Sequence, residues 1–337
     1  MAAHSALPAS PSGQAVVGLQ LIISTKGGDP DGSGKVRPLN AADRRSIRLN
    51  NGVELPALGF GVFQTPADET QAAVEEALSI GYRMIDTAAS YLNEPEVGAA
   101  IAASGIDRSE LFVQTKVWVT NYSYEGALHA FDVSVRKLRL DTVDLYLLHQ
   151  PLPQDFDATV GAYRALERLL DEGRVRAIGI SNFSPAHLEA VLPRLSVVPA
   201  VNQVEVHPYY NQPTLRAVHA ERGIVTQAWS PLGGVYVYRP SDPGAPKNAL
   251  RDPVIAGIAE KRGKTPAQVV LRWHVDSGRS AIPKSVRPER IAENLDVFDF
   301  ALSADEIATI DALDTGVRGG PNQDELDFRT FDRPIPE

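Results

Sequence analysis

The chain has 337 residues, of which 43% are hydrophobic and 22% are charged, and it has no cysteine. These proportions are typical of a globular domain, and they exclude a disulfide framework, a thiolate metal site and a cysteine nucleophile. The net charge of −9 argues against a nucleic acid or an anionic membrane as a partner. No apolar run approaches the length of a membrane span, and the absence of cysteine suits a reducing cytoplasm, which is the expected location.

The first 45 residues differ in composition from the rest of the chain. Pro, Ser, Gly and Asp are frequent there, and residues 27–34 (GGDPDGSG) consist of these four residue types alone. We therefore predict a flexible N-terminal extension over residues 1–45 and one folded domain over residues 46–337. The domain is expected to open with a β-hairpin, because Asn50, Asn51 and Gly52 separate two short alternating runs.

After this hairpin, apolar runs typical of strands alternate with amphipathic helical segments. The predicted strands cover residues 57–60, 83–86, 111–116, 144–149, 177–181, 200–205, 225–230 and 281–284. The predicted helices include residues 69–79, 124–138, 159–172 and 214–222, with a further pair, 253–262 and 266–277, before the last strand. One helix of this pair is expected to be an extra helix beside the regular βα units.

Eight strands connected by helices predict a parallel sheet, and eight is the number that closes a barrel. An open doubly wound sheet is the alternative, but the glycine-rich fingerprint that usually follows its first strand is missing. The predicted fold is therefore α/β, a (β/α)8 TIM barrel with an N-terminal β-hairpin and extra helices.

Three predicted neighbouring strands end in polar residues whose chemistry is complementary. Asp86, Lys116 and His149 end the second, third and fourth strands, and Tyr91 lies in the loop after Asp86. Each has an ordinary structural explanation when taken alone, such as a turn cap, a buried ion pair or a satisfied core histidine. In a parallel barrel, however, the carboxyl ends of all strands meet at one face, where active sites lie.

The four residue types together suit proton donation to a carbonyl oxygen. A free tyrosine has a pKa of about 10, which a neighbouring ammonium group lowers toward neutrality. Asp86 would keep Lys116 charged and oriented, and His149 would hydrogen-bond the same substrate oxygen as Tyr91. The chain shows no metal-ligand spacing, so we expect no metal.

Four stretches jointly resemble the aldo-keto reductases, and most closely the bacterial 2,5-diketo-D-gluconate reductases. They are residues 86–94 (DTAASYLNE), Lys116, residues 147–149 (LLH) and residues 282–294 (IPKSVRPERIAEN). The resemblance extends from about residue 46 to the C-terminus. It implies that Asp86, Tyr91, Lys116 and His149 form the catalytic tetrad of that family, with Tyr91 as the acid in reduction and the base in the reverse reaction.

The resemblance also implies NADPH as the cofactor and assigns its contacts residue by residue. Ser181, Asn182 and Gln203 would bind the nicotinamide carboxamide, Trp229 would stack on the ring, and Ser230 and Leu232 would line the pyrophosphate. Lys284, Ser285 and Arg290 would bind the 2′-phosphate, with Glu293 and Asn294 near the adenine. A local basic cluster in an acidic chain suits a phosphate, because Arg offers bidentate geometry. Ordinary roles remain open, as a helix cap for Ser181 and Asn182 and as core packing for Trp229.

The expected substrate pocket departs from many relatives at two places. Leu92 stands where many have glycine, and Gln150 stands where many have tryptophan; Phe63 and Trp118 are expected as pocket walls. The loop 234–251 and the tail 319–328 are expected to face the substrate.

The predicted function is reduction of an aldehyde or ketone, including a keto-sugar or dicarbonyl, by a monomer or weak oligomer. A non-catalytic barrel that still holds the cofactor, and physiological oxidation of an alcohol at the same site, are the alternatives.

Overall fold

The computed structural model describes residues 45–233, 248–325 and 335–337. The predicted extension, residues 1–45, lies outside the described residues apart from Arg45, so the domain boundary stays a prediction. Most of the predicted loop 234–251 and the last part of the predicted tail 319–328 also lie outside them.

Eight parallel strands follow one another in chain order within one sheet, from β3 to β10. The two edge strands also meet, because Gly59 N donates to Ala281 O at 2.9 Å and Ala281 N donates to Ala57 O at 2.9 Å. The sheet is therefore closed, which confirms the predicted barrel and excludes the open doubly wound sheet. The strands are β3 (Phe60–Gly61), β4 (Met84–Asp86), β5 (Phe112–Val117), β6 (Val143–Leu148), β7 (Val175–Ser181), β8 (Val201–Glu205), β9 (Val225–Trp229) and β10 (Ser280–Ala281).

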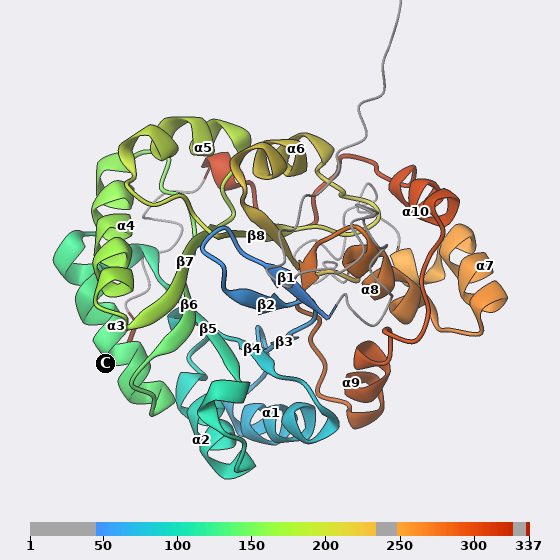
Figure 1. Ribbon diagram of the computed structural model, residues 1–337, viewed down its shortest axis with the longest axis horizontal. Coiled ribbons are helices and arrows are strands. Elements are labelled where there is room, and N and C mark those ends of the chain that lie inside the picture. The colour runs from blue at the N-terminus through green and yellow to red at the C-terminus, as the bar shows by residue number, and fades with distance from the viewer. Residues whose placement is uncertain (1–44, 234–247, 326–334) are drawn as a thin grey trace, which may run out of the picture. The chain divides into compact units, whose positions relative to one another are not determined.

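Helices surround this barrel, as Figure 1 shows. They are α1 (Ala67–Ile80), α2 (Glu94–Ser104), α3 (Tyr124–Leu138), α4 (Phe156–Asp171), α5 (Pro185–Val191), α6 (Pro213–Arg222), α7 (Pro253–Arg262), α8 (Pro266–Asp276), α9 (Pro288–Leu295) and α10 (Ala304–Asp311). Helices α3 and α7 begin and end where the sequence predicts. Helix α7 is the extra helix, and it lies beside α10, where Arg262 Nε donates to Glu306 Oε1 at 3.1 Å. The last strand is shorter than predicted because Pro283 has no N–H to continue the ladder.

The predicted hairpin closes one end of the barrel. Strands β1 (Ser46–Arg48) and β2 (Glu54–Pro56) pair antiparallel, and the turn between them places Gly52 at φ +87°. A side chain strongly disfavours this left-handed conformation, whereas glycine adopts it at no steric cost. Leu49 and Leu55 of the hairpin are buried and pack in the interior cluster of the barrel, which covers its amino-terminal end.

The barrel wall separates two apolar clusters, and alternation along each strand decides which side chain joins which. On β5, Val113 and Val117 pack outward under the helices, whereas Phe112 belongs to the interior cluster. Gln114 and Lys116 have the same parity as Phe112 and are fully buried. The interior therefore changes along β5 from apolar beside the hairpin, through polar, to charged at the carboxyl end.

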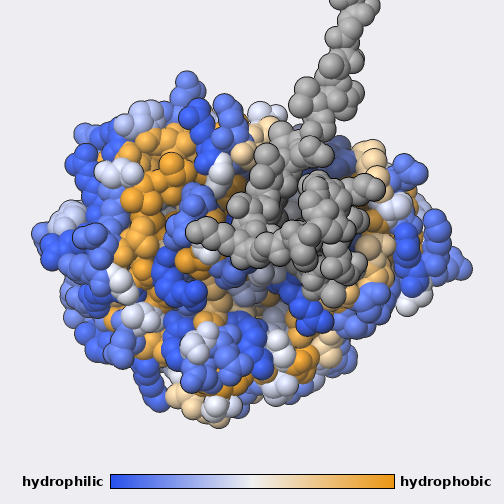
Figure 2. All heavy atoms as spheres, viewed as in Figure 1, coloured by the Kyte–Doolittle hydropathy of each residue, from blue (hydrophilic) through white to orange (hydrophobic). Residues whose placement is uncertain are grey.

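The face that carries the hairpin is mostly hydrophilic in Figure 2, with hydrophobic residues gathered between α4, α5 and the hairpin. Val198 is exposed, and its carbonyl accepts a bond from Asn50 of the hairpin turn at 3.4 Å. Among the described residues, every helix is too short or too polar to cross a membrane.

Candidate active site

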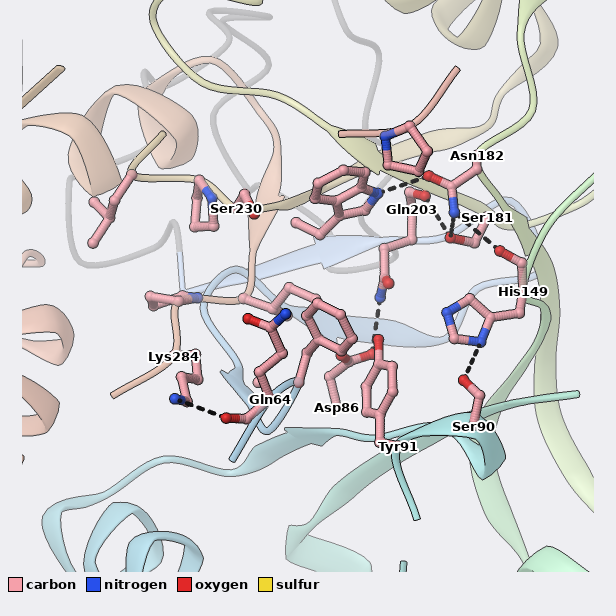
Figure 3. A pocket seen from close by; sticks show the side chains of 18 of the residues that line it. Gln64, Asp86, Ser90, Tyr91, His149, Ser181, Asn182, Gln203, Ser230 and Lys284 are labelled. Carbon is pink, nitrogen blue, oxygen red and sulfur yellow. Dashed lines mark hydrogen bonds between the residues drawn. The ribbon is translucent and has the colours of Figure 1, made fainter. Parts of the chain in front are cut away.

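A cavity of about 650 Å³ opens at the carboxyl-terminal ends of the strands (Figure 3). Its walls include the end of β4, the ends of β7, β8 and β9, and the loops that follow them. Predicted residues that line it are Phe63, Asp86, Tyr91, Trp118, His149, Gln150, Ser181, Asn182, Gln203, Trp229, Ser230, Leu232 and Lys284.

Lys116 lies behind the cavity wall and joins Asp86 to Tyr91. Its ammonium nitrogen donates to Asp86 Oδ1 at 2.6 Å, to the Thr87 carbonyl at 2.9 Å and to the Tyr91 hydroxyl oxygen at 3.2 Å. Three donors thus meet three acceptors, which satisfies the whole ammonium group. The strand ends hold Asp86 and Lys116, and a short 3₁₀ turn, Ala89–Tyr91, brings the phenol back over them.

Burial works against the charge on Lys116. It lowers the pKa of this amine, while the Asp86 carboxylate beside it raises the pKa again. Removing either partner would leave the other charge buried without compensation. The ion pair therefore couples the two side chains into one unit beneath the tyrosine.

His149 stands on the other side of Tyr91, with ring centroids 5.5 Å apart and the planes at 76°. Burial, and secondarily the Lys116 charge, lower its pKa well below the usual value, so the imidazole is neutral near pH 7. The Ser90 hydroxyl lies 3.2 Å from His149 Nδ1. Trp118 packs edge-on against the same ring at 5.0 Å and fixes its orientation from the far side.

The side of the cavity opposite Tyr91 carries three linked polar side chains. Asn182 has φ +69° and donates to the His149 carbonyl at 3.0 Å and to Ser181 Oγ at 3.1 Å. Trp229 donates its indole N–H to Asn182 Oδ1 at 2.8 Å, and Ser181 Oγ donates to the Gln203 carbonyl at 2.7 Å. These bonds hold the indole beside the Asn182 amide, and the stacking role of Trp229 stays a prediction.

The pattern of donors and acceptors at this wall fits a primary carboxamide. Gln203 Nε2 is committed to Asp86 Oδ1 at 2.9 Å and to Gln227 Oε1 at 2.8 Å. No described residue donates to Gln203 Oε1, so this oxygen is left to accept from a carboxamide N–H₂. Ser181 Oγ has accepting capacity left as well. The residues present therefore fit the amide end of a nicotinamide.

The predicted phosphate cluster lies at the end of β10 and on α9. Lys284 lines the cavity and donates to the Gln64 carbonyl at 3.4 Å, whereas Ser285, Arg290, Glu293 and Asn294 do not line it. Lys284 and Arg290 are exposed, and no carboxylate of the described residues forms an ion pair with either. Glu293 accepts from Thr265 at 2.5 Å. One exposed cation in the cavity wall and a second on α9 suit a phosphate outside the cavity.

Leu92 is the one predicted pocket residue that does not line the cavity. It has φ +61° and ends the 3₁₀ turn that carries Tyr91. Glycine adopts this conformation more easily than leucine, which gives a backbone reason for the glycine of many relatives.

Sequence reasoning missed several lining residues. Ser90, which contacts His149, stands in the quoted motif beside Tyr91 and was recognisable there. Asn248 and Leu250 belong to the loop 234–251, and Pro321 and Gln323 belong to the tail 319–328; both segments were expected to face the substrate, and these residues line the cavity. The lining residues that the sequence did not assign to the site are Gly61, Gln64, Ile282 and Pro283, which reach the cavity only through the fold.

Comparisons with known proteins agree with this geometry. The model of the aldo/keto reductase family matches residues 57–315. The chain belongs to the aldo/keto reductase family. It is 54% identical to morphine 6-dehydrogenase of Pseudomonas putida over 85% of this chain and 96% of that protein, and 44% identical to the methylglyoxal reductase DkgA of Escherichia coli over 83% and 97%.

A solved structure, described as a mutant of Gox0644 in complex with NADPH, is 42% identical and has a TM-score of 0.77. The match covers 84% of this chain and 98% of the chain in that structure. The family assignment confirms the predicted resemblance and makes the chain an oxidoreductase. NADP(H), the predicted cofactor, is the cofactor of this family. Because the similar proteins are named as reductases and a dehydrogenase, the alternative of a non-catalytic barrel loses its support.

Proposed function

We propose that this enzyme reduces an aldehyde or ketone to the alcohol with NADPH, and that small dicarbonyls and keto-sugars are the first substrates to examine. The observation that carries the proposal is Lys116, which bonds both Asp86 Oδ1 and the Tyr91 hydroxyl beside a cavity that His149 also lines. The names of the similar methylglyoxal and glyoxal reductases support the dicarbonyl class.

NADPH, when bound, supplies the hydride that reaches the carbonyl carbon. Ser181 Oγ and Gln203 Oε1 would accept from its carboxamide, and Trp229 would stack on the nicotinamide ring. Ser230 and Leu232 would line the pyrophosphate, with Lys284, Ser285 and Arg290 on the 2′-phosphate and Glu293 and Asn294 near the adenine. Each of these contacts is a proposal from the family motif, which the donor and acceptor pattern at the wall supports.

The proton comes from Tyr91. Its hydroxyl donates to the carbonyl oxygen, and the Lys116 ammonium group at 3.2 Å stabilises the phenolate that remains. The Ser90 hydroxyl, 3.2 Å from Nδ1, can donate to that nitrogen; His149 then carries its proton on Nε2 and can donate to the same oxygen. A neutral histidine suits this role, because it donates one bond without competing with Tyr91 as the acid.

Oxidation of an alcohol is the second candidate. The relative at 54% identity is named a dehydrogenase, and the same four side chains serve the reverse reaction, with the Tyr91 phenolate as the base.

A Tyr91→Phe variant tests the proposal. We expect kcat/KM for methylglyoxal, glyoxal and a keto-sugar to fall at least ~100-fold, because the acid is lost, while the Kd for NADPH stays within about threefold. Fluorescence titration gives the Kd, and loss of NADPH absorbance gives the rate.

The matched control is Tyr124→Phe, since among the described residues this hydroxyl accepts a hydrogen bond from Arg168 alone, at 3.2 Å on the outer surface. Near-native turnover by Tyr91→Phe would overturn the assigned role. Turnover of alcohols with NADP⁺ and of no carbonyl would favour the dehydrogenase.

A further inference from the structure

Four buried side chains, Asp86 of the tetrad and three glutamines, form a closed ring of hydrogen bonds across the barrel interior. Gln114 Nε2 donates to Asp86 Oδ1 at 2.6 Å and to Gln227 Oε1 at 2.8 Å. Gln203 Nε2 donates to the same two oxygens, at 2.9 and 2.8 Å (Figure 3 shows its bond to Asp86). The Nε2 atoms of Gln114 (β5) and Gln203 (β8) thus share the same two acceptors. These acceptors are Asp86 Oδ1 on β4 and Gln227 Oε1 on β9.

The chemistry of Asp86 fixes the direction of every amide in this ring. An ionised carboxylate only accepts, so both neighbouring glutamines must turn their N–H₂ groups toward it. Gln227 then has to present its oxygen to both nitrogens. Its own Nε2 donates back to Gln114 Oε1 at 3.2 Å and outside the ring to Ser280 Oγ at 3.3 Å and Met84 Sδ at 3.7 Å, so no amide in the pattern is reversed.

Burial makes this arrangement costly to break. Asp86, Gln114, Gln203 and Gln227 are each exposed by 1% or less. A buried donor that loses its acceptor keeps its full desolvation cost, so the ring persists as a unit. Loss of the shared acceptor on Gln227 would leave one N–H on each of the other two glutamines without a partner.

We propose that Gln114 and Gln227 are positioning residues. They hold the Asp86–Lys116 pair, which supports the proton donor, and Gln203, on the cofactor side, in a fixed position relative to each other. Gln114 fixes Asp86 Oδ1, the atom on which Lys116 Nζ also rests at 2.6 Å. Gln227 holds the Gln203 nitrogen in the ring, so that Gln203 Oε1 stays directed at the cavity as the acceptor for the carboxamide. This inference rests on the proposed function, because it assigns Gln203 to the nicotinamide.

The two glutamines should give different signatures when altered. Gln227→Met removes the shared acceptor with little change in volume, so the Gln203 amide keeps only its bond to Asp86 Oδ1 and its Oε1 is no longer fixed toward the cavity. Gln114→Met leaves both acceptors of Gln203 in place but takes one of three donors from Asp86 Oδ1. The first variant therefore affects recognition of the carboxamide, and the second affects turnover.

The experiment measures the binding of NADP⁺ and of its 3-acetylpyridine analogue, which lacks the carboxamide N–H₂, by titration without substrate. We expect the wild-type enzyme to bind NADP⁺ about threefold to tenfold more tightly than the analogue, because the loss of one hydrogen bond changes Kd by about this factor. In Gln227→Met this preference should fall to within about twofold of unity. Gln227→Glu, whose protonated carboxyl offers an oxygen to the ring and an O–H to Gln114 Oε1, should restore it.

Gln114→Met should keep the wild-type preference and lower kcat about tenfold with an unchanged KM. Leu145→Met is the matched control, since Leu145 is the register partner of Gln114 on β6 and lies in the apolar interior cluster. It should alter neither readout. If Gln227→Met does not fold, the Gln114→Met and Gln227→Glu results decide.

A wild-type preference retained by Gln227→Met, or an unchanged kcat in Gln114→Met, would overturn the inference. A wild-type enzyme that binds NADP⁺ but does not prefer it to the analogue would overturn it too, while leaving the Tyr91 test intact. An enzyme that fails to bind NADP⁺ at all would instead overturn the proposed function.

Discussion

At the scale of single residues, Arg290 and Lys284 are exposed cations without a carboxylate partner among the described residues. An Arg290→Ala variant should raise the Kd for NADPH at least about tenfold, because the proposed charge-assisted bond to the 2′-phosphate would be lost. The Kd for NADH, which has no such phosphate, should change less than about twofold.

Parallel fluorescence titrations with both cofactors measure this difference. Arg222→Ala is the control, because Arg222 ends α6 at the amino-terminal side of the barrel, where Gly223 faces the hairpin. Equal losses for NADPH and NADH would contradict a contact to the 2′-phosphate.

The sequence predicts the tetrad positions well because strand ends in a closed barrel converge regardless of the details of packing. Asp86, Lys116 and His149 therefore meet as soon as their strands are assigned. The glutamine ring is different. Gln114 and Gln227 are 113 positions apart, and a glutamine inside an apolar strand has no pattern that predicts its partner.

At the scale of elements, the C-terminal segment is attached to the end of β8. Glu205 is buried and accepts from Gly319 N at 2.8 Å and Gly320 N at 3.0 Å, while His207 Nε2 lies 3.0 Å from the same carboxylate. Pro321, the next residue, lines the cavity. The attachment therefore sets where this segment borders the site.

Gly320→Ala should displace this segment. A Cβ there would lie 2.6 Å from Trp229 Cη2, and the indole cannot easily yield because its N–H is bound to Asn182. Arg318, which contacts Asn322 at 3.0 Å, should then become accessible. We expect trypsin to cleave after Arg318 at least about fivefold faster, as followed by mass spectrometry.

The same displacement should raise the KM for the carbonyl several-fold. Gly257→Ala on α7 is the control, since a Cβ there meets nothing within 4 Å. Unchanged cleavage at Arg318 in Gly320→Ala would mean that the segment tolerates the extra methyl group and that the close approach to Trp229 does not hold it.

At the scale of the whole molecule, the barrel follows from the alternation of strands and helices, which the sequence shows clearly. Element ends were harder to predict, because they depend on capping and on backbone partners outside the element. The short helices α9 and α10, eight residues each, are not among the helices whose bounds were predicted. The predicted strand 281–284, for example, includes Pro283, whose carbonyl still accepts from Gly61 at 3.0 Å. Local pattern predicts the kind of element better than its limits.

Three buried histidines tie the stability of the whole domain to pH. Burial lowers the pKa of His149 and His274 well below the usual value and that of His219 to about 4. Two of the rings also accept a bond: Asn202 donates to His219 Nε2 at 2.9 Å, and Arg279 donates to His274 Nδ1 at 3.2 Å. Protonation would place two donors face to face, so these rings stay neutral while the protein is folded.

Each such histidine binds its proton only on unfolding. Above the unfolded pKa of about 6.5 it does not change the free energy of unfolding, and below that pH it lowers this free energy progressively. Glu94 acts in the opposite direction, because burial raises its pKa and the folded protein takes up that proton first. Burial also lowers the pKa of His187, so more protons are gained on unfolding than Glu94 releases near pH 5. The free energy of unfolding should therefore fall as pH drops from 6.5 to 5.

His219→Gln isolates one of these protons, at a site on the outer side of the barrel wall where the ring contacts Asn202 and Thr226. The substitution will lower stability at every pH, but the slope between pH 6.5 and 5 should become shallower by about 1 kcal/mol per pH unit. Urea unfolding at four pH values measures both slopes. Parallel curves for the two proteins would show that His219 does not stay neutral in the folded protein, and the pH dependence would then have to come from other groups.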